Sequence, residues 1–275
     1  MQVLSFVWDP SPGIDLGFFM IRYYSLMFVI AFSIGWFLTK RIFKNEGQSD
    51  DKMDSLFIYV VLATLVGARL GHVFFYQPEL LKDDFLSVFL PFSFKNGFEF
   101  TGFRGLASHG AAIGIVVAMY FYSKKVIKKP ILWVLDRIVI AVASGAIFVR
   151  IGNFINSEII GKATNSDFGV VFKQLGEDFP RHPAQLYESF CYIFVFTTLY
   201  YLYWKTNKSK QMGYLLGMFL VLLWTVRFFV EFVKEAQVDE RAEWALNTGQ
   251  WLSIPFIVIG AYLMISSPKR PVPNE

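Results

Sequence analysis

Long apolar runs recur along the whole chain and are separated by short polar loops. Seven runs approach or exceed the roughly 20 residues that an α-helix needs to cross a bilayer: 17–39, 55–76, 105–123, 131–150, 183–204, 212–233 and 248–267. Charged residues make up only 17% of the 275 residues, whereas an ordinary soluble domain carries about 25%. We therefore expect an all-α integral membrane protein with seven transmembrane helices, folded as a single domain over 1–275.

Basic residues gather in every second loop. Lysines and arginines follow the first, third, fifth and seventh runs, whereas the intervening loops 77–104 and 234–247 are richer in aspartate and glutamate. Short cytoplasmic loops carry the excess of Lys and Arg, so the pattern predicts an N-terminus outside and a C-terminus in the cytoplasm. The net charge of +4 follows mostly from these loops, and it does not indicate a nucleic-acid partner.

Two segments on the predicted outer side are too long for simple turns. Residues 77–104 mix phenylalanine, leucine and charge, which suits an arm lying in the membrane interface, with a plain loop as the alternative. Residues 151–182 are polar and contain glycine, so they predict a small extramembrane lobe.

Ionisable and strongly polar groups within the predicted spans are the main functional signal. Each charged group costs about 2.5–3.5 kcal/mol to insert, yet six of the seven runs contain or adjoin such groups: Arg22, Arg69, His72, His109, Arg150, His182, Gln185, Glu188, Arg227 and Glu231. The predicted orientation places nearly all of them in the outer half of the bilayer. Arginines outnumber acids there, and arginine binds phosphate through two parallel hydrogen bonds. We infer a site for an anionic lipid or a similar amphiphile near the outer face.

Simpler explanations exist for several of these groups. Arg22, Arg69 and His72 could extend toward the interface or satisfy helix ends. Arg227 and Glu231 are four residues apart and could form an internal ion pair.

Other polar or small residues favour structural roles. The small residues of 110–114 favour close helix packing over a ligand loop. Cys191 lies in an apolar run without a base beside it, so we expect it to pack and not to react. The three histidines lack metal-ligand spacing, and we expect no metal. For His109 itself, a catalytic and a structural role are both open.

The string RIGNFINSEIIGK at 150–162 closely resembles the signature of bacterial prolipoprotein diacylglyceryl transferases, which reads approximately GRxGNFxNxExxG. Strings elsewhere resemble the family in the same order: IRYYSLMFVIAF, GARLGHVFFY, SHGAAIGI, RHPAQLYES, RFFVEFVKE and GQWLSIPFIVIG. The resemblance covers essentially the whole chain. The departures are mild: the family usually has HGG where this chain has HGA at 109–111, and it commonly has glycine at the positions of Val149 and Ser157.

The resemblance implies an enzyme of the bacterial cytoplasmic (inner) membrane whose active site faces the outer leaflet. Such an enzyme transfers the diacylglyceryl group of phosphatidylglycerol to the thiol of the lipobox cysteine of a prolipoprotein. A thioether forms, glycerol 1-phosphate leaves, and no cofactor is needed. By motif, the family's site residues fall on Tyr24, His109, Arg150, Asn153, Glu158, Gly161, Arg227 and Glu231.

The leaving group and the nucleophile suggest roles for four of these residues. Arg150 and Arg227 would grip the phosphate more tightly as the bond to it breaks, with Glu231 orienting Arg227. A free thiol has a pKa near 8.5, so only a few per cent is thiolate at neutral pH. His109 is the candidate base, although water could serve instead.

The remaining residues carried across by motif have supporting roles. Tyr24 and Asn153 would bind the headgroup or orient the arginines, and Glu158 and Gly161 would shape the turn after the fourth run.

Two other classes of protein would also explain an arginine-rich site. A transporter or channel for an anionic amphiphile needs a polar path through both leaflets, but the inner half of the runs is nearly free of polar residues apart from Asp136 and Arg137. A lipid-binding scaffold without catalysis would bind the phospholipid and leave a lipobox peptide unmodified.

Overall fold

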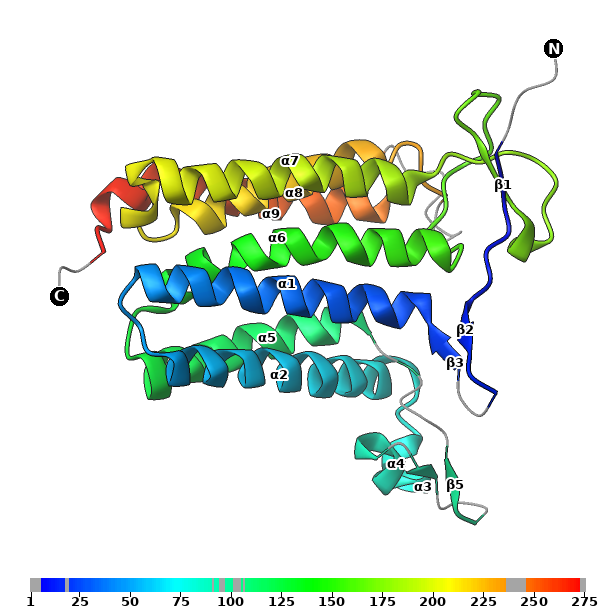
Figure 1. Cartoon of the computed structure of the whole chain (residues 1–275), viewed down its shortest axis with the longest axis horizontal. Coiled ribbons are helices and arrows are strands. Elements are labelled where there is room, and N and C mark those ends of the chain that lie inside the picture. The colour runs from blue at the N-terminus through cyan, green and yellow to red at the C-terminus, as the bar shows by residue number, and fades with distance from the viewer. Residues whose placement is uncertain are drawn as a thin grey trace. The chain divides into compact units, whose positions relative to one another are not determined.

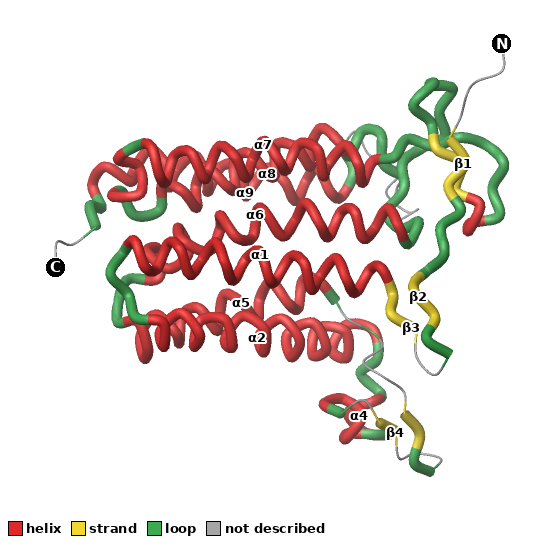
Figure 2. The backbone as a smooth tube through the Cα atoms, in the orientation of Figure 1, coloured by secondary structure: helices red, strands yellow, loops and turns green. Residues whose placement is uncertain are grey.

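The structure is a computed structural model. It describes residues 6–17, 20–90, 92–93, 97–100, 105, 107–235 and 246–272. The chain clusters into two compact units: unit 1 consists of residues 1–39 and 135–275, and unit 2 of residues 40–134. Most of the described regular structure is helical, and the strands, yellow in Figure 2, are short pieces outside the long helices (Figure 1).

The described residues contain seven helices of 15 residues or more, and each overlaps one predicted apolar run. They are α1 (Tyr23–Asn45), α2 (Asp50–Tyr76), α5 (Ser108–Tyr122), α6 (Ile131–Ile155), α7 (Ala184–Lys205), α8 (Tyr214–Val230) and α9 (Thr248–Ser266). A π-helical turn over Ser123–Ile127 extends α5, and short 3-10 turns cover Lys173–Leu175, Asn207–Lys210 and Ser267–Lys269.

Five helical segments are long and apolar enough to cross a membrane: Tyr23–Asn45, Asp50–Tyr76, His109–Ile127, Ile131–Ile155 and Thr248–Lys269. The prediction of several membrane-spanning helices is therefore confirmed. Helix α8 is apolar but has only 17 residues. Helix α7 is more polar, since it includes Gln185 and Glu188. The count of seven spans and their orientation stay predictions.

The first helix begins later than predicted, because the chain before it pairs as a hairpin. The antiparallel strands β2 (Gly13–Asp15) and β3 (Met20–Arg22) precede α1, which starts at Tyr23. A side chain at Gly13 would collide with the backbone of β3, so glycine permits this close pairing. The prediction that Arg22 lies inside the first span is therefore wrong, since Arg22 ends a strand.

In unit 1, α8 runs beside both α7 and α9 (Figure 1). Helices α8 and α9 approach closely at two glycines. A Cβ atom on Gly217 would lie 2.6 Å from the carbonyl oxygen of Gly260, and one on Gly260 would lie 2.7 Å from that of Gly217. Small residues at such a crossing let two backbones pack closely.

The polar pair at the start of α6 has a structural role in unit 1. The Asp136 carboxylate accepts hydrogen bonds from the backbone N–H groups of Gly213, at 2.6 Å, and Leu216, at 2.8 Å. It therefore caps the N-terminus of α8 from a neighbouring helix. Arg137 donates to the carbonyl oxygen of Ser209 at 3.2 Å. These contacts account for the two polar residues at this end of the helices.

A parallel strand pair ties the start of the chain to the segment that follows α6. Strand β1 (Phe6–Trp8) pairs with β6 (Val170–Phe172). The Trp8 indole donates to the carbonyl oxygen of Phe154 at 3.0 Å and stacks on the Phe154 ring with centroids 4.5 Å apart. The predicted lobe at 151–182 thus contains a strand and a 3-10 turn.

In unit 2, α2 and α5 pack through facing glycines. A Cβ atom on Gly67 would lie 2.6 Å from the carbonyl oxygen of Gly110, and one on Gly71 would lie 2.6 Å from the Gly110 Cα. One turn further along α5, a Cβ atom on Gly114 would lie 2.7 Å from the carbonyl oxygen of Ala63. The prediction that 110–114 serves helix packing is confirmed.

The predicted arm at 77–104 contains two helical turns and a strand pair: α3 (Leu80–Asp83), α4 (Phe85–Phe89), β4 (Phe92–Ser93) and β5 (Glu99–Phe100). Arg69 of α2 donates to the carbonyl oxygens of Ser87, at 2.8 Å, and Val88, at 3.2 Å. Arg69 therefore fastens α4 to α2. Phe85 and Phe89 are exposed, which suits contact with lipid, and the interfacial position of the arm stays a prediction.

Replacing Gly114 by leucine should destabilise the α2–α5 pair. Overpacking a close contact costs about 1–3 kcal/mol, so we expect Gly114→Leu to lower the midpoint of thermal unfolding in detergent by several degrees. Ala112→Leu is the matched control, because Ala112 is exposed on the same helix, and its midpoint should stay near that of the unsubstituted chain. Equal midpoints for the two variants would contradict packing through Gly114.

Candidate functional site

Seven of the eight predicted site residues belong to unit 1, and His109 belongs to unit 2. Helix α6 supplies Arg150 and Asn153 near its C-terminal end, and α8 supplies Arg227 near its own. Tyr24 is the second residue of α1.

The buried carboxylate of Glu188, on α7, lies at the centre of the unit 1 cluster. Its Oε2 atom lies 2.7 Å from Arg150 Nε, and its Oε1 atom lies 3.2 Å from Lys234 Nζ. The side chain of Glu188 is 0% exposed and that of Lys234 is 5% exposed, so water does not screen the charges. Oε2 accepts no aligned hydrogen bond, and its contact with Arg150 is therefore mainly electrostatic. Removing one partner of such a buried pair costs about 3–5 kcal/mol.

A chain of hydrogen bonds leads from Arg150 to the segment after α6. Arg150 Nη1 donates to Asn153 Oδ1 at 3.3 Å, and Asn153 Nδ2 donates to Glu158 Oε2 at 3.2 Å. Tyr24 lies close enough to interact with Asn153, Glu158 and Arg150. Gly152 lets Tyr24 approach, since a Cβ atom there would lie 3.0 Å from the Tyr24 ring. The structure therefore brings four of the predicted site residues into one network.

Lys234 joins Glu188 to a second acid, Glu231. Lys234 Nζ lies 3.3 Å from Glu231 Oε2. Gly249 of α9 leaves room for Glu231, because a side chain there would collide with its carboxyl group. Lys234 is not among the residues predicted from the sequence, because it falls at the start of the predicted loop 234–247. Its spacing of three residues from Glu231 was the available signal.

Arg227 has no such partner. Within the described part of the chain, its guanidinium makes no hydrogen bond or ion pair, and it stacks over the Trp224 ring at 5.0 Å from the centroid. The ion pair that the spacing of Arg227 and Glu231 allows is not formed, because Glu231 pairs with Lys234. The prediction that Glu231 orients Arg227 through a direct contact is therefore wrong. Arg227 Nε is buried and has no hydrogen-bond partner among the described residues, which typically costs about 1–3 kcal/mol.

Gly161 positions the backbone next to Lys234. Gly161 N donates to the carbonyl oxygen of His182 at 3.0 Å, and Lys162 N donates to that of Val233 at 2.8 Å. A Cβ atom on Gly161 would lie 2.6 Å from the His182 Cβ and 2.8 Å from the Val233 oxygen. Only glycine fits between these two segments, so Gly161 aligns the segment that carries Lys234.

The turn after α6 uses strained backbone conformations. Ser157 and Ile159 have φ values of 54° and 55°, in the left-handed region that favours glycine. The glycine common in the family at the position of Ser157 suits this conformation. The Ser157 hydroxyl donates to Gln174 Oε1 at 3.2 Å, and Gln185 Nε2 donates to the Glu158 carbonyl oxygen at 2.5 Å. These bonds hold the turn that presents Glu158.

Arg181 fixes the segment that follows this turn. It forms two bonds with Glu177, at 2.5 and 2.7 Å, contacts Glu235, and donates to the Gly161 carbonyl oxygen at 3.2 Å. The hydrogen bonds with Glu177 raise the pKa of the Arg181 guanidinium above its ordinary value, and Glu235 acts in the same direction. Arg181 therefore stays charged and links the lobe to the chain after α8.

His109 is the second residue of α5 in unit 2, and its side chain is exposed. Its ring lies 5.1 Å from the Phe75 ring and 6.0 Å from the Tyr76 ring, between centroids, and Tyr76 also stacks on His72 at 5.4 Å. Within the described residues of the chain, no carboxylate contacts His109. Aromatic rings thus orient His109, and its catalytic role stays a prediction.

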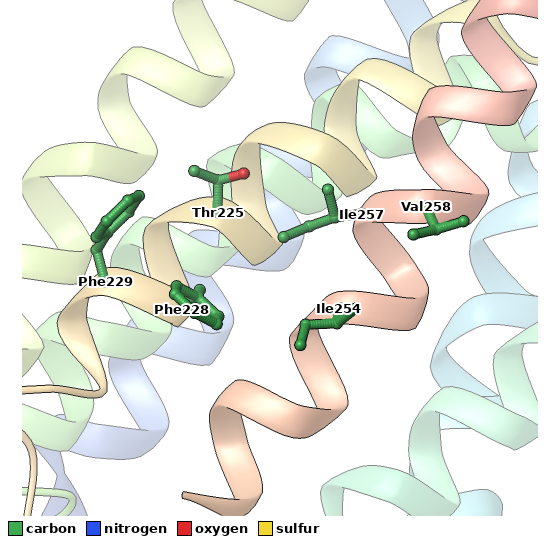
Figure 3. Close-up of a pocket in the computed structure, with 6 residues that line it drawn as sticks. All are labelled: Thr225, Phe228, Phe229, Ile254, Ile257 and Val258. Atoms are coloured by element: carbon green, nitrogen blue, oxygen red, sulfur yellow. The ribbon is translucent and has the colours of Figure 1, made fainter. Parts of the chain in front are cut away.

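Figure 3 shows an apolar groove between α8 and α9, with a volume of about 260 Å³, lined by Thr225, Phe228, Phe229, Ile254, Ile257 and Val258. Successive helical residues rotate by about 100°, so Arg227 projects about 160° around α8 from both Thr225 and Phe229. The wall of the groove holds no charged residue. The groove therefore lies on a different face of α8 from Arg227, and it is not an anion site.

Comparison with known proteins identifies the family. The family model described as prolipoprotein diacylglyceryl transferase matches residues 13–266. The phosphatidylglycerol–prolipoprotein diacylglyceryl transferase of Bacteroides fragilis is 40% identical over 271 residues, which cover 98% of this chain and 97% of that protein. The protein of the same name from Chloroherpeton thalassium is 39% identical over 98% of this chain and 97% of its own length. The one from Tolumonas auensis is 38% identical over 96% of this chain and 98% of its own length. These matches confirm the resemblance seen in the sequence, and the chain belongs to the prolipoprotein diacylglyceryl transferase family.

Proposed function

We propose that this chain transfers the diacylglyceryl group of phosphatidylglycerol to the lipobox cysteine of prolipoproteins, the first step of lipoprotein maturation. Its near full-length identity with enzymes named for this reaction carries the proposal. The buried cluster around Glu188 supports it, because Arg227 supplies a cation without a partner among the described residues. The substrates are then a membrane lipid and a secreted protein precursor.

The reaction defines what the site has to stabilise. The cysteine sulfur attacks the glycerol carbon that carries the phosphate, a C–S bond forms, and the C–O bond to phosphate breaks. The thiol proton passes to a base, and glycerol 1-phosphate leaves with more negative charge than the phosphodiester had. A cation that binds the phosphate more strongly as this charge develops lowers the barrier.

Arg227 is better suited than Arg150 to contact the phosphate directly. Arg150 already forms an ion pair with Glu188 and a hydrogen bond with Asn153. In the described part of the chain, Arg227 Nε has no hydrogen-bond partner, and a guanidinium can bind phosphate through two parallel bonds. We assign the phosphate contact to Arg227, and we assign Arg150 to the framework and to the positive field around it.

The other predicted site residues have roles that fit their contacts. The exposed carboxylate of Glu158 accepts bonds from Asn153 and Asn156, at 3.2 and 3.1 Å, and it can also accept from the hydroxyl groups of the glycerol headgroup. Tyr24 and Asn153 hold this arrangement, and Gly161 aligns the backbone at Lys234.

The membrane arrangement follows from the helices and from the loop charges. We propose a multi-pass protein of the bacterial cytoplasmic membrane in which α7 and α8 complete seven spans, with the active site toward the outer leaflet. The alternation of basic loops supports this orientation. The arm at 77–104 and the lobe at 151–182 then lie on the outer side.

Cysteine labelling tests the orientation. A cysteine placed in 236–242 should react with an impermeant thiol reagent added to intact cells, whereas one placed in 125–128 should react only after the membrane is opened. Both variants should carry Cys191→Ser, so that the single native cysteine does not contribute. The reverse labelling pattern would overturn the orientation and the outer-leaflet site.

A transfer assay with arginine variants tests the function. Purified protein, phosphatidylglycerol and a lipobox peptide should give a peptide whose mass increases by one diacylglyceryl group. We expect Arg227→Gln to reduce transfer by about 10²–10³-fold at nearly unchanged thermal stability, because the substitution breaks no ion pair. Arg227→Lys should recover little, since lysine lacks the planar fork.

Two comparisons complete the assay. Arg150→Gln should lower thermal stability as well as activity, because it removes a partner of the buried Glu188. Arg41→Gln controls for the loss of one charge, since Arg41 is exposed on α1. Near-normal activity of Arg227→Lys would show that only a diffuse positive field is needed, and lipid binding without any mass gain would favour a non-catalytic scaffold.

The pH dependence of a His109 variant tests the base. If His109 accepts the thiol proton, His109→Gln should reduce turnover by at least about a hundredfold at neutral pH and leave phosphatidylglycerol binding nearly intact. Part of the loss should be recovered as the pH rises toward the thiol pKa near 8.5, because more thiolate then forms unaided. A variant-to-native rate ratio that stays constant between about pH 6.5 and 9 would remove His109 from the catalytic residues.

A further inference from the structure

Two cations compete for the carboxylate of Glu231. Glu231 N donates to the carbonyl oxygen of Arg227 at 3.0 Å, so the helical turn continues and puts the two side chains on one face, within reach of each other. Lys234 follows three residues later, and its Nζ lies 3.3 Å from Glu231 Oε2. The carboxylate therefore pairs with Lys234, and no acid of the described ranges pairs with Arg227.

Glu188 and Glu231 are already paired with cations other than Arg227. Arg150 and Lys234 supply two positive charges in contact with these two carboxylates. Among the described residues, Arg227 forms an ion pair with neither acid. Lys234 is buried, so its attraction for both acids is little weakened by water.

The backbone around Lys234 is held independently of these charges. The backbones of Gly161 and Lys234 pair in an antiparallel β-bridge. Next to it, Glu235 N donates to the carbonyl oxygen of Ile160 at 3.1 Å. Arg181 contacts Glu235 as well. The ammonium group of Lys234 is thereby kept between the two carboxylates, where it contacts both.

We infer that Lys234 is a positioning residue for the phospholipid. It holds the Glu231 carboxylate away from Arg227 and so keeps the Arg227 guanidinium available for the phosphate of an anionic lipid. Without the charge of Lys234, Glu231 could pair with Arg227, which lies one helical turn earlier on the same face, and Glu231 would then compete with the phosphate. The inference rests on the proposed function, because it concerns the same lipid.

The test compares lipid affinity and turnover in the full-length protein in detergent. Affinity is measured with a fluorescent phosphatidylglycerol, and KM and kcat with the peptide transfer assay. We expect Lys234→Met to raise both the dissociation constant and KM for phosphatidylglycerol by at least about fivefold, with a smaller change in kcat. Lys234→Arg, which keeps the charge, should stay close to the native values.

Lys162→Met is the matched control. Lys162 belongs to the segment that pairs with 233–235, but its Nζ bonds the carbonyl oxygen of Phe232, at 3.0 Å, in place of an acid. Its removal should leave lipid affinity unchanged. An equal loss of affinity in Lys162→Met and Lys234→Met would contradict a specific role for Lys234.

A second variant, Glu231→Gln, distinguishes a positioning role of Lys234 from direct contact between Lys234 and the lipid. In Glu231→Gln, no carboxylate competes for Arg227, so adding Lys234→Met should cause no further loss of affinity. If Lys234 touched the lipid itself, its removal would cost the same in both backgrounds, and the inference would fail. This double variant removes one charge of each sign, so it also provides the test if Lys234→Met alone does not insert.

The outcomes for the function and for Lys234 are distinguishable. A native protein that neither binds phosphatidylglycerol nor modifies the peptide would refute the proposed function. A native protein that does both, with Lys234→Met at native affinity, would refute the role of Lys234 alone. A loss of thermal stability and kcat at unchanged KM, without recovery in Lys234→Arg, would show that Lys234 is only structural.

Discussion

A carboxylate that water cannot reach must be neutralised by the protein itself, and Glu188 is such a group. Arg150 of α6 and Lys234 from the segment after α8 provide the two positive charges that it contacts. These three residues come from parts of the chain far apart in sequence, so their pairing fixes α6, α7 and the end of α8 relative to one another. Because a buried charge without a partner is costly, the cluster can tolerate few arrangements.

The segments around this cluster are also fixed in place by specific contacts. Asn153 links Arg150 to Glu158 through two hydrogen bonds. Gly161 lets the lobe pack against the segment of Lys234, because only a residue without a side chain fits between His182 and Val233. The positive φ of Ser157 is the local strain that this path requires. Much of the family signature at 150–162 therefore serves to place the charged groups.

The helices could be predicted from the sequence, because apolar runs of the required length form helices in any membrane protein. The hairpin before α1 could not, since Phe18 and Phe19 made residues 17–39 look like one apolar run. A strand forms only with a partner segment, here Gly13–Asp15. The pattern of apolar residues within one run does not show that such a partner exists. The misplacement of Arg22 follows from the same cause.

Most of the charged residues that the structure brings together in unit 1 could be named from the sequence, but their pairing could not. Spacing along one helix suggested Arg227 with Glu231, and the structure joins Glu231 to Lys234. Sequence spacing shows which side chains of one helix can reach each other. It does not show that a cation beyond the helix end competes for the same carboxylate. Lys234 is also placed by Gly161, from a segment more than 70 residues earlier. Such a contact is a property of the fold and is absent from the local pattern.

The types of the three cations match their different tasks. Lys234 carries a compact charge that can lie between two carboxylates, and it contacts Glu188 and Glu231. Arg150 interacts in two directions, through an ion pair with Glu188 and a hydrogen bond to Asn153, which suits a planar group with five donors. Arg227 keeps a buried donor unused. Under the proposed function, the phosphate needs a cation that the protein has not already paired, and Arg227 is our choice because no acid among the described residues contacts it.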